Sequence, residues 1–186
     1  MMRLPDYPGF NAQWNFMHLW HEIGHGLSDT SEAGADEVSA LVCRHAFQDC
    51  AFLAVHADLR AAATLLSGDS FPDYKWPCVE AIDSTLAMKG PAPWNEIQAI
   101  GELARTAPHD NRTDSVQFVA WNLCQAAPMA FSFNKDLGQM ATVCDQLLQN
   151  NVFKDAQQRR IAARFALAAR RLSIGILAYK QSAPAP

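Results

Sequence analysis

NAQWNFMHLWHEIGHGL, residues 11–27, is the stretch of sequence that decides the fold. Its apolar side chains recur at helical spacing, and Gly26 stands where such a helix could end. At 100° per residue, one stripe of this helix consists of Trp14, His18, His21 and His25. The opposite, apolar stripe consists of Phe16, Leu19, Trp20, Ile23 and Leu27. The stretch therefore predicts an amphipathic helix that buries one side and turns a histidine-rich side toward a site.

Helix signals continue through the rest of the chain, and few segments alternate in the manner of a strand. Further helices are expected over residues 31–66, 77–89, 94–106, 113–128, 134–149 and 153–180, with capping by Thr30 or Ser31, Thr113 and Asn134. Breaks containing Gly, Pro or Asp separate most of them. The sequence thus predicts an all-α fold with a single core of about six to seven helices. Residues 1–181 would form one domain, and residues 182–186 a disordered tail.

Composition narrows the class of protein. The chain has 186 residues, is 49% hydrophobic and carries a net charge of −4, which suits a globular domain. Its apolar stretches are too short to cross a membrane, and the first ten residues do not resemble a secretory signal. Residues 154–180 are basic, but no aromatic side chains interleave with the charges. We therefore expect neither a nucleic-acid nor a membrane partner.

The cysteines indicate a reducing compartment. There are five, an odd number, at wide spacing and without a Cys-x-x-Cys pair. This pattern argues against a disulfide framework and against a zinc site built from cysteine. We expect reduced, mostly buried thiols in a cytoplasmic protein.

His21-Glu22-Ile23-Gly24-His25 is an H-E-x-x-H sequence, the motif that carries chemistry. Residues four apart lie above one another on a helix, so both imidazoles can reach one Zn²⁺ ion. Glu22 lies about 100° round the helix from His21, where it can touch a water molecule beside the metal without binding the metal. The motif predicts Glu22 as the catalytic base.

A third zinc ligand is offered by the next helix. Glu32 and Asp36 are four residues apart near its start, and an antiparallel arrangement brings them level with His25 and His21. Small residues, among them Gly34 and Ala35, would let the two helices approach closely. Either carboxylate suits zinc. Acidic residues in a first helical turn are also favoured by the helix dipole without any metal.

His-Glu-Ile-Gly-His followed by Glu-x-x-Ala-Asp resembles the zincin metallopeptidases of the glutamate-ligand type, over residues 14–47. The resemblance implies that Glu32 is the third zinc ligand and that Asp36 holds a ligand histidine by a hydrogen bond. Zincins place a β-sheet before the motif to hold the substrate backbone. Only 20 residues precede His21, and they do not predict a sheet.

Two hypotheses follow. The first is a zinc-dependent hydrolase, in particular a metallopeptidase, acting on a peptide or protein, with Trp14 and His18 lining the substrate cleft. The second is a non-catalytic helical module with a structural or vestigial zinc site and a protein partner, which the lack of a sheet favours. His45 and His56 lie beside apolar residues and are interpreted as core or boundary histidines.

Overall fold

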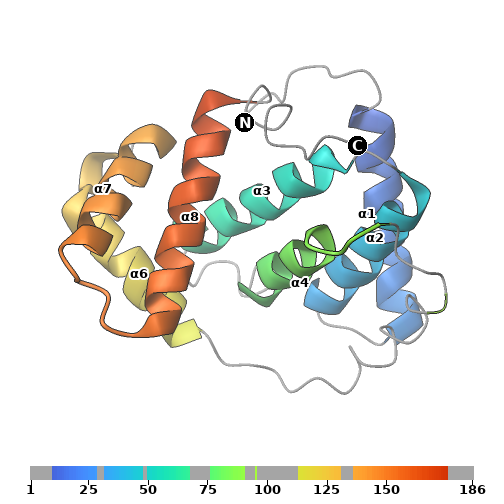
Figure 1. Cartoon of the computed structure of the whole chain (residues 1–186), viewed down its shortest axis with the longest axis horizontal. Coiled ribbons are helices and arrows are strands. Elements are labelled where there is room, and N and C mark those ends of the chain that lie inside the picture. Colours follow the sequence, from blue (N-terminus) through green and yellow to red (C-terminus); the bar gives the residue numbers. More distant parts are fainter. Residues whose placement is uncertain are drawn as a thin grey trace. The chain divides into compact units, whose positions relative to one another are not determined.

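A computed structural model describes residues 10–28, 32–47, 50–67, 76–90, 95, 113–130 and 136–175. Within these ranges the chain forms seven named helices and no strand, so the all-α class is confirmed (Figure 1). The helices are α1 (Phe10–Ser28), α2 (Glu32–Ala46), α3 (Ala51–Ser67), α4 (Trp76–Leu86), α6 (Thr113–Ala126), α7 (Leu137–Gln149) and α8 (Ala156–Ile174). None of them combines the length and the apolar character needed to cross a membrane. Most of the helix expected over 94–106, its following loop and the tail lie outside the described residues.

The described helices pack as two compact units. The first holds α1, α2, the start of α3 up to Ala57 and nearly all of α4. The second holds the remainder of α3 from Asp58 onward together with α6, α7 and α8. That residues 1–181 form a single domain stays a prediction.

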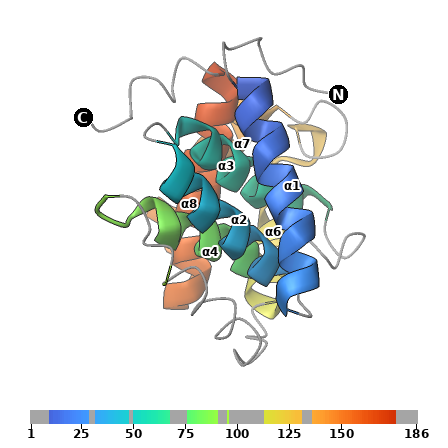
Figure 2. The same ribbon diagram turned by 90° about the vertical axis from the view of Figure 1, so that its right-hand side faces the viewer.

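In the first unit α1 and α2 lie side by side and antiparallel, as expected (Figure 2). The contacts at the two ends show the opposite directions. His25, near the end of α1, lies beside Glu32 at the start of α2, whereas Phe16, near the start of α1, stacks edge-on against Phe47, which directly follows α2. An apolar cluster fixes the pair: Val38, Leu41 and Val42 of α2 are buried against Phe16, Trp20 and Met88. α1 continues two residues past Gly26, where the sequence placed its end.

The prediction of one helix over residues 31–66 is wrong, because two helices occupy this range. α2 ends at Ala46, and α3 begins at Ala51. The thiol of Cys50 lies 3.6 Å from the Phe47 carbonyl, and the Phe47 ring packs edge-on against Phe52 of α3. The two helices are therefore separate, and packing overrides a sequence that is compatible with a continuous helix.

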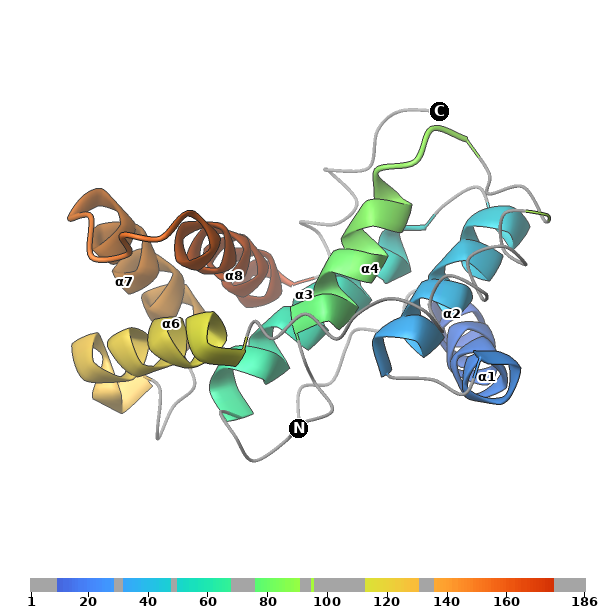
Figure 3. The same cartoon turned by 90° about the horizontal axis from the view of Figure 1, so that it is seen from below.

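In the second unit α6, α7 and α8 pack together around a buried core (Figure 3). Asp155 caps α8, with its Oδ1 accepting from the backbone N–H groups of Gln157 and Gln158 at 2.7 and 3.1 Å, and these bonds lower its pKa. α8 stops at Ile174, not at 180 as expected, because Gly175 adopts φ 84° and its N–H bonds to the Arg171 carbonyl. Asp136 caps α7, whereas the expected cap, Asn134, lies outside the described residues.

Candidate metal centre

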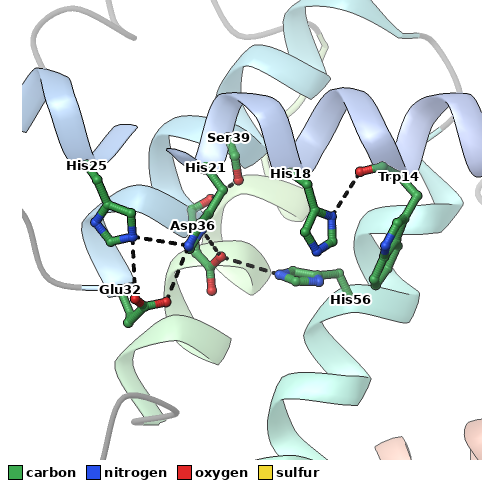
Figure 4. Close-up of polar contacts among 8 residues, drawn as sticks. All are labelled: Trp14, His18, His21, His25, Glu32, Asp36, Ser39 and His56. Atoms are coloured by element: carbon green, nitrogen blue, oxygen red, sulfur yellow. Dashed lines mark hydrogen bonds and ion pairs between the residues drawn. The ribbon is translucent and has the colours of Figure 1, made fainter. Parts of the chain in front are cut away.

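Three ligand-type atoms converge where the C-terminal half of α1 faces the first turn of α2 (Figure 4). His21 Nε2 lies 3.2 Å from His25 Nε2. Glu32 reaches both rings, with Oε2 at 3.3 Å from His21 Nε2 and Oε1 at 3.4 Å from His25 Nε2. The structure thus brings together the three residues that the sequence predicted as zinc ligands.

These spacings fit a tetrahedral zinc site. Bonds of about 2.0 to 2.2 Å from zinc to nitrogen or oxygen place neighbouring ligand atoms about 3.3 to 3.6 Å apart. The separations of 3.2 Å between the two Nε2 atoms, and of 3.3 and 3.4 Å from each of them to one oxygen of Glu32, are close to that range. The two histidines face different oxygens of this carboxylate. Two imidazoles and one carboxylate are also a donor set that zinc commonly takes in hydrolases. The residues present therefore fit the ion in type and in spacing.

Asp36 determines which nitrogen of His21 faces the other donors. Its side chain is completely buried, and its Oδ1 lies 2.8 Å from His21 Nδ1. Because a carboxylate only accepts, His21 Nδ1–H must donate, and in the neutral ring Nε2 then carries the lone pair. That lone pair is directed at the point that His25 and Glu32 also face. Asp36 lies against the other ring nitrogen, so Glu32 and not Asp36 belongs to the converging set.

One side of the centre is open to solvent. The His21 side chain is 11% exposed, whereas those of His25 and Glu32 are 30% and 32% exposed. A cation held by these three atoms would keep a coordination position toward water. In zinc proteins, catalytic sites keep one coordination position for water, whereas structural sites are closed by four protein ligands.

Gly24 allows the helices to come close enough for these contacts. A Cβ added at this position would lie 3.0 Å from the Ala35 Cα and 3.3 Å from its carbonyl oxygen. These atoms belong to the backbone of α2 and cannot turn aside. This small residue, the fourth of the motif, is thus part of the construction of the centre, because it sets the distance between α1 and α2.

The other predicted residues take different places. Glu22, the predicted base, is exposed on α1 directly after His21. Trp14 and His18, the predicted cleft residues, contact each other: His18 Nδ1–H donates to the Trp14 carbonyl at 3.0 Å, and their ring centroids are 4.9 Å apart. Both lie one to two turns before the ligands on the same helix, with His18 exposed and Trp14 half-buried.

His56 is the residue whose connection to the site the sequence did not reveal. It is buried on α3, and its Nε2 lies 3.3 Å from Asp36 Oδ1, the oxygen that also accepts from His21. On a continuous helix, residues 36 and 56 would be about 30 Å apart at 1.5 Å per residue. Only the turn between α2 and α3 brings them together, and no local signal marks that turn.

Comparisons with known proteins add no information on this site. No family model, no curated protein and no solved structure matches the chain.

Proposed function

We propose that this protein is a zinc-dependent hydrolase and, following its resemblance to the zincins, a metallopeptidase. One observation carries the proposal: the Nε2 atoms of His21 and His25 and the carboxylate of Glu32 converge at separations of 3.2 to 3.4 Å, close to those between neighbouring zinc ligands. The motif Glu22 adds a carboxylate beside them on the same helix.

Each residue has a role in this proposal. His21, His25 and Glu32 hold the ion, and Asp36 keeps the His21 ring in the tautomer and orientation that binding needs. When bound, zinc polarises a carbonyl group and makes a water molecule acidic enough to lose a proton near neutral pH. The exposed Glu22 carboxylate would act as the base, taking up a proton from that water and returning it to the leaving amine.

The substrate proposed is a peptide or protein. Trp14 and His18 belong to the same stripe of α1 as the ligands and would contact residues of the substrate next to the bond that is cut. A tryptophan face and an imidazole can contact a side chain and a carbonyl oxygen, respectively.

A second candidate is a helical protein-interaction module in which the zinc site is structural, or in which only the motif is left and no zinc is bound. It is favoured by the finding that the described ranges contain no strand whose edge could take up an extended peptide. The two candidates differ in the fourth coordination position, which holds water in the enzyme and a protein atom in the module.

Metal content and cleavage together test the proposal. Purified protein should hold about one zinc per chain by plasma mass spectrometry, as three protein ligands allow. His25→Ala should lose it, whereas Glu22→Gln should keep the zinc and lose cleavage of a peptide library. His45→Ala, at an exposed position late in α2, is the matched control and should change neither. A wild type that takes up no zinc on titration would contradict the proposal. Zinc binding without any cleavage would favour the interaction module.

A further inference from the structure

His56 contacts the centre from a third helix. Its Nε2 is 3.3 Å from Asp36 Oδ1, and the same oxygen is 2.8 Å from His21 Nδ1. Asp36 thus lies between two imidazoles, one from α1 and one from α3, and Figure 4 shows the three side chains in line. The carboxylate and His56 are both buried, so water contributes little to holding them in place.

The His56 ring is itself held in position. The Trp14 ring of α1 packs against it edge-on, with centroids 5.3 Å apart and planes at 73°. The His18 ring approaches in a similar way, with centroids 6.1 Å apart. Contacts therefore run from Trp14 on α1 to His56 on α3, to Asp36 on α2 and back to His21 on α1. This closed path joins three helices.

The chemistry of the path follows from its acceptor. Asp36 Oδ1 accepts, so the facing nitrogens of His21 and His56 both donate N–H groups. Two donors from opposite sides fix the direction of a buried carboxylate more firmly than one, and the orientation of Asp36 sets the orientation of His21. Outer partners of this kind tune how well a histidine binds metal.

We propose that His56 is a positioning residue, which acts through Asp36 to hold His21 in its metal-binding orientation. The proposal rests on the proposed zinc site but goes beyond the motif, because residue 56 lies outside both motif segments. It assigns α3 a role in the centre even though α3 supplies no ligand.

The test compares three variants of the full chain. His56→Leu removes the N–H donor and keeps most of the volume, whereas His56→Gln keeps an amide N–H that can take the place of Nε2. His45→Leu is the control, because His45 is an exposed histidine on α2 and does not lie in the core or at its boundary as expected. Zinc affinity is measured by competition with a chelator. Exchange of the proton on His21 Nδ1 with water is measured by ¹⁵N NMR on metal-free protein.

We expect His56→Leu to weaken zinc binding about tenfold, the lower end of the range for outer partners of metal ligands. The His21 Nδ1 proton should exchange faster in the same variant. His56→Gln should restore both properties largely to the wild-type values, and His45→Leu should alter neither. Equal losses in His56→Leu and His56→Gln would overturn the proposal, because they would show that only the packing of an imidazole matters. An unchanged exchange rate in His56→Leu would overturn it as well.

The two readouts separate this inference from the proposed function. A wild type without zinc affinity would refute the hydrolase. The exchange rates in the metal-free variants would then still decide whether His56 positions His21.

Discussion

Replacing Gly24 by alanine tests the closeness of α1 and α2 most directly. The new Cβ would lie 3.0 Å from the Ala35 Cα, whereas carbon atoms rest about 3.5 to 4.0 Å apart. The helices must therefore separate locally by about 0.5 to 1 Å. The distances from Glu32 to the two histidines, now 3.3 and 3.4 Å, would then approach about 4 Å, beyond the edge of a zinc tetrahedron.

The expected change in the free energy of unfolding of Gly24→Ala has two contributions of opposite sign. Overpacking costs about 1 to 3 kcal/mol, and alanine in a helix stabilises by up to about 1 kcal/mol relative to glycine. Gly26→Ala isolates the contribution of helix propensity. Apart from its chain neighbours and the backbone of its own helical turns, no described residue comes within 4 Å of a Cβ at this position. The free energy of unfolding should thus differ between the two variants by about 1 to 3 kcal/mol, with Gly24→Ala the less stable.

Urea unfolding of both metal-free variants measures this difference, and chelator competition measures the zinc affinity. Affinity should fall at least about tenfold in Gly24→Ala, comparable with the loss of an outer partner, and should be unchanged in Gly26→Ala. If Gly24→Ala were as stable as Gly26→Ala and bound zinc like the wild type, the close approach of the helices would not be what holds the centre together.

The remaining predictions concern the ligands and the second unit. Glu32→Ala should abolish stoichiometric zinc binding, whereas Asp36→Asn should retain one zinc with an affinity about 10- to 100-fold weaker; equal effects in the chelator assay would contradict the separate roles. Asp58 is fully buried and has two arginine partners, so Asp58→Ala should lower the free energy of unfolding by about 3 to 5 kcal/mol. Asp145→Ala, at an exposed ion pair, should lower it by less than about 1 kcal/mol, and similar urea midpoints for the two variants would refute this. Burial, with a smaller contribution from Asp145, raises the pKa of the Cys144 thiol to about 12, so iodoacetamide at pH 8 should modify it in urea but not in the native protein, as mass spectrometry would show.

Much of the first unit follows from the sequence because its signals are local. The apolar stripe containing Phe16 and Trp20 predicts α1, and the two rings do pack on α2. The expected burial of the whole stripe is wrong, because Leu19 is 58% exposed and the buried residues of α1 include Met17 and His21. The spacing of His21, His25 and Glu32 fixes their convergence once two helices run antiparallel, since positions four apart on a helix share a face.

What could not be predicted depends on packing between distant residues. No glycine or proline lies between residues 35 and 66, so nothing local marks the end of α2. The turn is stabilised by aromatic contacts of Phe47, and its consequence is the placement of His56. The end of α8 is a different case, because Gly175 was available as a stop signal and its positive φ shows why the helix ends there.

The three converging side chains all lie within twelve consecutive residues, from His21 to Glu32. The entropy lost on closing so short a loop is small, because this cost grows with the logarithm of loop length. During synthesis the segment leaves the ribosome long before α3, and a chain folds from its N-terminal end as it emerges. A nascent α1–α2 hairpin would therefore already present the three donors, and the contact from His56 would be added only when α3 is complete. In that order of assembly, the three donors would converge before the core around them forms.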